Sequence, residues 1–136
     1  MTFEGKVSVW WCALIAVING IEIASAIYAG ISVTVGVGIL MLVVLDLILI
    51  PTLFNNRVTV TKKEIVIQFG FLQKVLSPKD ITRIKKVKGF SAAFAASEDR
   101  VGIEIRGRNA VFVSLKDNDA FVKELMRINK RIQFMI

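Results

Sequence analysis

The chain has 136 residues, of which 54% are hydrophobic, and its 18 basic and 11 acidic side chains give a formal net charge of +7 at pH 7. It contains no His and a single cysteine, Cys12, which excludes a hydrolase triad with a His base, a disulfide within one chain and a Cys/His zinc site. The hydrophobic fraction is high for a soluble protein and points to a membrane segment.

Charge is distributed unevenly along the chain. Residues 7–54 contain two charged side chains, Glu22 and Asp46, whereas residues 57–136 contain 17 of the basic and eight of the acidic side chains, a net charge of +9. We therefore divide the chain into a two-helix transmembrane anchor, residues 1–56, and a basic domain, residues 57–136.

Two apolar stretches, residues 7–28 and 31–53, each reach the length of about 20 residues that a helix needs to cross a bilayer. Ala29 and Gly30 separate them, and a Gly next to small residues can reverse the chain there. No small-residue cleavage site interrupts the apolar sequence, so we expect a retained hairpin rather than a cleaved signal peptide. Basic residues flank the outer ends and the turn is uncharged, which predicts a multi-pass protein of the cell membrane with both termini cytoplasmic.

Glu22 and Asp46 are costly inside a bilayer, by about 2.5 to 3.5 kcal/mol for an ionised acid at a helix centre. In the predicted hairpin Glu22 lies across from Val37 and Asp46 across from Ala13, so the two acids do not pair with each other. We interpret them as tolerated acids near an interface or as contacts with a second subunit, with a proton or ion path as the alternative. Small residues in both spans favour close helix packing and a homo-oligomer. Pro51 is expected to end the second span.

From residue 57 the apolar period changes to two, which is typical of strands. We expect strands at residues 57–61, 64–69, 75–76, 81–87, 101–106 and 110–114. Ser114 and Asp117 have the spacing of a helix start, with the Ser hydroxyl as the cap. A terminal helix is predicted from Lys116 to Asn129, and it buries Phe121 together with Leu125 and Ile128.

Four segments carry a family resemblance: the small-residue loop 91–97, Asp99-Arg100 with the strand after it, residues 113–117 and residues 120–125. Together they resemble the bacterial pleckstrin-homology-like (PH-like) domains, especially the YyaB-like group, over about residues 57 to 130. Leu115 departs from that group, which usually has proline there. The resemblance implies an α+β fold, with an antiparallel β-barrel or sandwich capped by one C-terminal helix behind the transmembrane hairpin. The family-like residues, which we interpret as structural, are Ser91, Ser97, Asp99, Arg100, Ser114 and Phe121.

Basic residues of the second domain are the candidates for binding anionic lipid or a partner. Arg83 and Lys85 share one face of their strand, and Lys86 and Lys88 share the other. A basic rim against the inner leaflet would orient the domain, and ordinary solubility is the alternative explanation for the charge. The candidates are Lys62, Lys63, Lys79, Arg83, Lys85, Lys86 and Lys88.

No motif for glycoside hydrolysis, phosphate binding by a Gly-rich loop, or metal ligation is recognisable, so we expect no catalytic residue, cofactor or metal. Nucleic-acid binding is not expected, because the Phe residues fit core positions rather than alternating with the basic ones. The sequence thus predicts a non-enzymatic membrane protein whose PH-like module engages lipid head groups or a protein partner. A role in bacteriocin immunity or envelope protection is the alternative, because some small membrane proteins with such domains resemble immunity factors.

Overall fold

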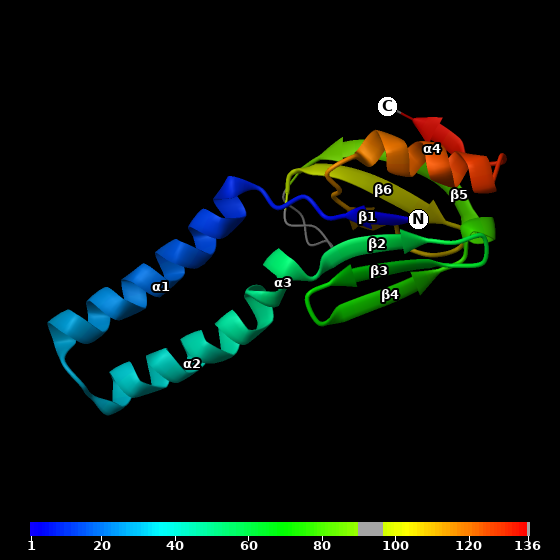
Figure 1. Ribbon diagram of the computed structural model, residues 1–136. Coiled ribbons are helices and arrows are strands. Elements are labelled where there is room, and N and C mark those ends of the chain that lie inside the picture. Colours follow the sequence, from blue (N-terminus) through cyan, green and yellow to red (C-terminus); the bar gives the residue numbers. More distant parts are fainter. Residues whose placement is uncertain (90–96, 136) are drawn as a thin grey trace.

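The structure is a computed structural model, and it describes residues 1–89 and 97–135. A hairpin of two long helices projects from one end of a β domain that consists of two sheets and a C-terminal helix (Figure 1). The predicted fold class is confirmed, although the two sheets do not close into a barrel.

The hairpin is formed by α1, Val9–Ala29, and α2, Val33–Leu49, followed by the single turn α3, Pro51–Phe54. Gly30 reverses the chain between the long helices with a φ of 71°, and the Ser32 side chain caps α2 by accepting from the Val35 backbone N–H. By length and composition, Val9–Ala29 and Val33–Phe54 are both able to cross a membrane. The two predicted helices are therefore present, and they fit a membrane anchor.

The prediction that Pro51 ends the second span is wrong. Pro51 occupies the first position of α3, where its missing N–H costs no helical hydrogen bond, and Ile50 remains in the helical conformation. The proline therefore interrupts the helix at Ile50 without ending its course, which continues to Phe54.

Each sheet has four strands. The first has the order β1-β2-β3-β4, and the second has the order β7-β6-β5-β8. The strands of the first sheet are Thr2–Glu4 (β1), Asn56–Val60 (β2), Ile65–Phe69 (β3) and Leu72–Leu76 (β4). Those of the second are Ile81–Lys88 (β5), Asp99–Ile105 (β6), Val111–Val113 (β7) and Gln133–Met135 (β8), with the short 3-10 turn η1, Pro78–Asp80, between β4 and β5.

Two strands were not predicted. β1 precedes the hairpin in sequence and pairs antiparallel with β2, with Thr2 opposite Thr59 and Glu4 opposite Arg57. β8 pairs parallel with β5, which is the exception to the antiparallel arrangement that we expected. Because β1 and β2 are neighbours, the helical hairpin is an insertion between two adjacent strands of one sheet (Figure 1).

The core lies between the sheets and α4, Asn118–Ile128. Inward-facing residues of β3 and β6 are fully buried, including Ile65 and Ile103. Phe121 of α4 is also fully buried, and its ring meets that of Phe3 from β1 edge to face, with ring centroids 5.4 Å apart. Residues from both sides of the hairpin therefore build one core.

Asp117, rather than Ser114, caps α4. The Asp117 carboxylate accepts from the Ala120 backbone N–H at 2.9 Å, whereas the Ser114 hydroxyl donates to the backbone carbonyl of Asp99. The helix begins two residues later than predicted, because Ser114 is held by β6 and is not free to cap it.

Candidate functional site

The β domain has two distinct ends. We call the end next to the hairpin proximal: here the Gly70 carbonyl accepts from Asn55 Nδ2 at 2.7 Å, and Trp11 of α1 packs near Phe69. We call the opposite end distal, and it comprises residues 61–64, 77–80, 106–110 and 129–132. The strand register assigns these segments to one end, because Val60 lies opposite Ile65, Ile65 opposite Leu76, and Ile81 opposite Ile105.

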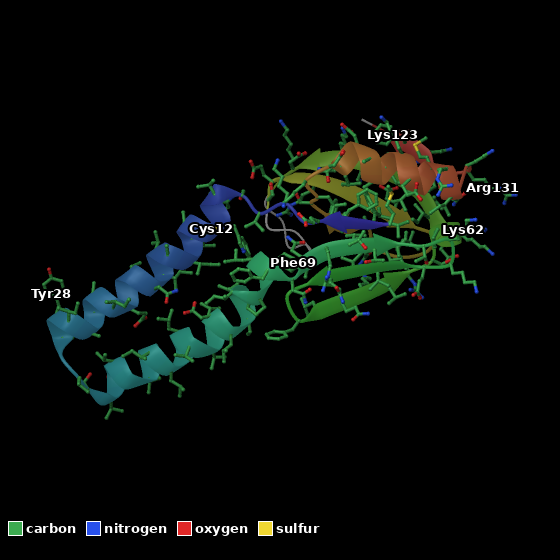
Figure 2. All side chains as sticks on the ribbon, viewed as in Figure 1. Cys12, Tyr28, Lys62, Phe69, Lys123 and Arg131 are labelled. Carbon is green, nitrogen blue, oxygen red and sulfur yellow. The ribbon has the colours of Figure 1, made fainter. Side chains whose placement is uncertain are left out.

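Charge differs strongly between the ends. The four distal segments contain seven basic and two acidic residues. The proximal segments 5–8, 50–55, 70–71, 97–98 and 114–117 contain two basic and two acidic residues. Figure 2 shows Lys62 and Arg131 together at the distal end, far from Cys12 and Tyr28 on the hairpin. The excess positive charge therefore faces away from the helices.

The seven basic candidates do not form one surface. Lys62 and Lys63 lie in the distal turn between β2 and β3, and Lys79 lies in η1. At the opposite end of β5, Lys88 pairs in register with Asp99, near the proximal end. These candidates therefore lie at both ends of the domain.

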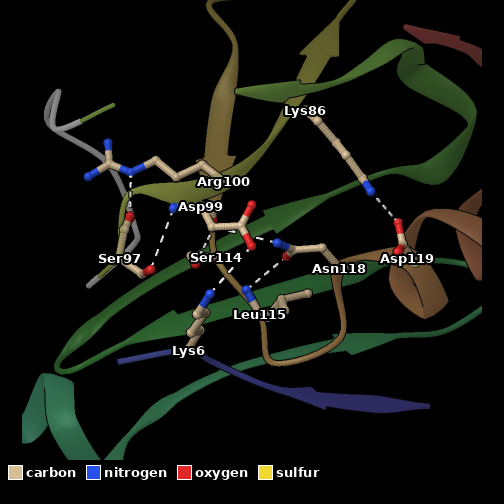
Figure 3. Close-up of polar contacts among 9 residues, drawn as sticks. All are labelled: Lys6, Lys86, Ser97, Asp99, Arg100, Ser114, Leu115, Asn118 and Asp119. Atoms are coloured by element: carbon tan, nitrogen blue, oxygen red, sulfur yellow. Dashed lines mark hydrogen bonds and ion pairs between the residues drawn. The ribbon is translucent and has the colours of Figure 1, made fainter. Parts of the chain in front are cut away.

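The remaining candidates are engaged in ion pairs along β5. Arg83 Nη1 and Lys85 Nζ both contact the Glu104 carboxylate, at 3.5 and 2.9 Å, as alternate residues on one strand face can do. Lys86 forms an ion pair with Asp119 of α4 on the other face (Figure 3). The Lys85 hydrogen bond holds the pKa of Glu104 below its ordinary value, and Lys86 does the same for the pKa of Asp119.

A polar pocket of about 430 Å³ opens at the distal end, between the start of β5, the end of β6 and the segment that leaves α4. We call it the distal pocket. Four cationic side chains and two carboxylates line it, a net charge of +2, together with the polar Thr82, Asn129 and Gln133. The charged lining residues are Lys79, Asp80, Arg83, Glu104, Arg106 and Arg131.

Arg83 is the most constrained of the pocket's cations. Its Nε atom is buried and has no hydrogen-bond partner among the described residues, although Nη1 contacts Glu104. A buried donor without a partner carries a desolvation cost, which a ligand oxygen would relieve. Arg83 therefore combines a structural ion pair with a donor that remains available.

Sequence reasoning identified Lys79 and Arg83 but missed Arg106, Arg131 and Asn129. Arg106 follows β6, and its backbone N–H donates to the Asp80 carbonyl at 3.0 Å, which brings it beside η1. Arg131 reaches the same end because the chain turns after α4 and returns as the parallel strand β8. The charges of Arg106 and Arg131 are visible in the sequence, but the return of Arg131 to this end through β8 was not predicted.

Four family-like residues lie near the proximal end, where they join segments of the backbone: Ser97, Asp99, Arg100 and Ser114. Ser114 Oγ and Asn118 Nδ2 both donate to the Asp99 carbonyl, and the Asp99 carboxylate contacts Lys6 at 3.4 Å (Figure 3). The buried Arg100 donates from Nε to the Ser97 carbonyl at 2.8 Å, and burial lowers the pKa of its guanidinium. Ser91 lies outside the described residues.

The PH-like group usually has proline at the position of Leu115. In this chain the backbone N–H of Leu115 makes a hydrogen bond. That N–H donates to Asn118 Oδ1 at 2.9 Å, a bond that proline could not make. Its side chain is buried in the core.

In the hairpin, Asp46 has a partner that the sequence did not indicate, whereas Glu22 lies close to its expected position. Asp46 accepts from Asn19 Nδ2 at 3.0 Å rather than lying beside Ala13. The Glu22 carboxylate lies against Gly38, next to the expected Val37. No contact between the two acids is present in the described part of the chain, and no group of three or more potential metal ligands occurs there.

Comparison with known proteins assigns the β domain. A sequence model described as bacterial PH domain matches residues 57–129. No curated protein and no solved structure gives a significant match. The matched region begins within β2 and ends just after α4, so it excludes β1 and β8.

Proposed function

This chain belongs to the bacterial PH domain family, and from that premise we propose that it is a membrane-anchored binding module whose cationic distal end engages a soluble acidic partner. The observation that carries the proposal is the position of the positive charge, which lies at the end of the domain opposite the apolar hairpin. PH domains are generally binding modules without catalytic activity.

The insertion of the hairpin supports an orientation for the domain. Both ends of the hairpin return to one β domain, through β1 and β2, so a hairpin that spans a bilayer holds the whole domain on one side. The excess of Lys and Arg in that domain favours the cytoplasmic side. Both termini then lie in the cytoplasm.

Exposed aromatic side chains support the same orientation. Phe54 and Phe71 are 84% and 76% exposed at the proximal end, beside the ends of α3 and α2. Large apolar side chains at that level suit the boundary between head groups and acyl chains. The domain then stands on its proximal end, and the distal end faces the cytosol.

This orientation favours a soluble partner over lipid of the same leaflet. Attraction between basic residues and anionic head groups decays within a Debye length, about 8 Å at physiological salt. The distal cations are separated from the hairpin by the length of the β domain (Figure 2). A soluble acidic protein can approach the distal cations to within that distance. Charge complementarity then accelerates the encounter.

The test is crosslinking of the full chain in its native membrane, followed by extraction in mild detergent and identification of the captured proteins. The test variant replaces both Lys62 and Lys63 with Gln. The matched control replaces Lys88 and Lys123 with Gln, which removes the same charge from exposed positions outside the distal end.

We expect a soluble protein to be captured by the wild type and by the control, and to be lost from the Lys62/Lys63 variant. Capture of lipid or of further copies of this chain alone would contradict the proposal. So would a partner whose capture is equally weakened in both variants, because general electrostatic attraction explains that result.

A further inference from the structure

We propose that a groove along the helical hairpin binds a transmembrane helix of another protein, one that carries a Lys or Arg side chain within its apolar span. The inference goes beyond the proposed function, because this partner lies inside the bilayer and the other is a soluble acidic protein. The two share the premise that the hairpin spans a membrane. The groove involves neither Lys62 nor Lys63.

The groove lies between α1 and α2 and has a volume of about 490 Å³. Its walls are Ile18 and Glu22 of α1 and residues of α2 between Gly38 and Ile48, a stretch that rises about 15 Å along the helix axis. We call it the hairpin groove. Both helices project away from the β domain, and no described residue of that domain lines the groove (Figure 1). The groove therefore offers about three turns of contact to another helix.

Glu22 is the polar feature of this groove. Among the described residues that line it, Glu22 alone is charged. Its carboxylate forms no hydrogen bond or ion pair with any described residue, whereas Asp46 accepts from Asn19. Eight residues separate Glu22 from Gly30 in the turn, so Glu22 lies about 12 Å from the outer end of the hairpin. At that depth the side chain does not reach the head groups.

Lipid alone does not satisfy this carboxylate. Of the residues of α1 and α2, all of which the structure describes, only Ile15 is buried. Acyl chains can cover the exposed apolar side chains of the hairpin, but they offer no hydrogen-bond donor to an acid. An acid inside a bilayer is costly unless it is paired. The required donor must therefore come from another helix.

Charge complementarity favours a different protein over a second copy of this chain. Residues 7–54 contain no Lys or Arg, so a second copy brings no cation into the membrane at the depth of Glu22. Lys6 precedes α1 and contacts Asp99 at the proximal end. In a two-fold dimer with both β domains on one side of the bilayer, the symmetry axis lies along the membrane normal, and the two Glu22 side chains would lie at equal depth. Their like charges oppose that arrangement.

A helix with a basic residue at this depth satisfies both proteins. Lys and Arg are as costly as an acid within an isolated span, and pairing with Glu22 relieves both costs at once. Gly38 leaves space for the pair. A Cβ added at Gly38 would lie 2.9 Å from Glu22 Oε2, so a larger residue there would displace the carboxylate from the groove.

The experiment measures energy transfer between the full chain and a synthetic helix in vesicles of zwitterionic lipid. Cys12 carries the donor fluorophore, because it is the single cysteine, is exposed and does not line the groove. The probe is a helix of about 20 Leu and Ala residues, with an acceptor fluorophore and one Lys about 12 Å from its outer end. Two control helices carry Leu in place of that Lys, or the Lys near the cytoplasmic end.

The test variant is Glu22→Gln, and the matched control is Asp46→Asn. Each removes one acid from the hairpin with little change of shape, but Asp46 faces Asn19 and does not line the groove. Circular dichroism of both variants in the vesicles checks that the helices are retained.

We expect the Lys helix to bind the wild type about tenfold more tightly than either control helix, the size of one hydrogen bond between membrane helices. Glu22→Gln should weaken binding of the Lys helix to the level of the control helices. Asp46→Asn should leave it unchanged.

Equal binding of the three helices to the wild type would overturn the inference, and so would equal weakening by Glu22→Gln and Asp46→Asn. Energy transfer between differently labelled copies of this chain that disappears in Glu22→Gln would assign the groove to a second copy, which also overturns it. None of these results affects capture of a soluble protein through Lys62 and Lys63. Loss of that capture with intact binding of the Lys helix would reject the proposed function alone.

Discussion

Asn19 and Asp46 join the two helices of the hairpin through a hydrogen bond of 3.0 Å from the Asn19 amide to the Asp46 carboxylate. Such bonds between membrane helices contribute about 0.6 to 2 kcal/mol. We predict that Asn19→Leu lowers the free energy of unfolding of the hairpin by about 1 kcal/mol. Unfolding of the full chain in detergent micelles, followed by helical circular dichroism, measures this change.

The neighbouring Gly20 provides a control for that variant. A Cβ added at Gly20 meets no atom within 4 Å, so Gly20→Ala should leave the stability of the hairpin unchanged or slightly raised. If Asn19→Leu proves as stable as the wild type, the polar pair does not contribute to packing.

Substitutions at Gly70 and Gly107 distinguish two destabilising effects of an added Cβ: strain of the backbone at positive φ, and a steric clash with a neighbouring atom. Both have positive φ, 63° and 70°, but a Cβ at Gly70 lies 3.0 Å from Thr52 Cγ2, whereas a Cβ at Gly107 meets nothing within 4 Å. We predict that Gly107→Ala costs about 1 kcal/mol from conformation alone. Gly70→Ala should cost more, because it also forces the hairpin away from the β3–β4 turn. Thermal melts of the two variants compare them directly, and equal losses would contradict the close contact at Gly70.

The insertion of the hairpin predicts a soluble form of the β domain. The Gly5 N–H donates to the Asn56 carbonyl at 2.7 Å, so the two ends of the insertion are adjacent. Replacing residues 6–55 with a short Asn-Gly turn should close β1 directly onto β2. We expect this chain to fold cooperatively without detergent, as measured by circular dichroism and by the dispersion of its amide resonances.

A matched chain of residues 57–136 alone tests the importance of β1. It lacks Phe3, which is 8% exposed and packs edge to face on Phe121. Loss of a buried Phe typically costs about 3 to 5 kcal/mol, so this shorter chain should be much less stable. Equal stability of the two chains would show that β1 is dispensable.

Acid should destabilise the β domain through exposed carboxylates that have basic partners. Hydrogen bonds to Lys116, Lys85 and Lys86 lower the pKa values of Glu4, Glu104 and Asp119. A lowered pKa in the folded state means that the stabilisation is present above the unfolded value and is lost as pH falls through the folded value. We therefore predict a decline below about pH 4.5, measured by denaturant unfolding of the soluble form, and a smaller decline for Glu104→Gln. A high salt concentration should reduce the effect, because these groups are exposed.

Local patterns predicted much of the fold. Alternation of apolar residues located β2 and β3 correctly, because Ile65, Ile67 and Phe69 all face the core. The spacing of apolar residues likewise located α4, and composition located both long helices. The strands and α4 have one buried face, which leaves a periodic pattern of apolar residues. The two long helices are apolar throughout, which leaves an uninterrupted hydrophobic stretch.

The strands that were not predicted from the sequence depend on partners that are distant in the chain. β1 and β8 have three residues each, too few for a period to be recognised, and they are strands only because β2 and β5 offer free edges. The distal pocket was missed for a related reason, since the segment with Arg131 is held beside η1 and β5 by the Asn129 hydrogen bonds and by the pairing of β8 with β5, which are contacts between distant parts of the chain. The contact of Asn19 with Asp46 was not predicted, because an uncharged amide leaves no charge signal in an apolar span.

The position of the hairpin between β1 and β2 also sets an order of events during synthesis. Residues 2–4 leave the ribosome before both helices, and their partner strand emerges only after the second helix. At about 5 to 20 residues per second, β1 remains unpaired for several seconds while the two helices are synthesised. Packing of the two helices then brings Gly5 and Asn56 together, which lowers the entropic cost of closing the long loop between β1 and β2. In the proposed membrane-spanning arrangement, a folded β domain is thus a sign that insertion has succeeded, and a chain whose helices fail to insert exposes an open sheet edge to the proteases and chaperones of the cell.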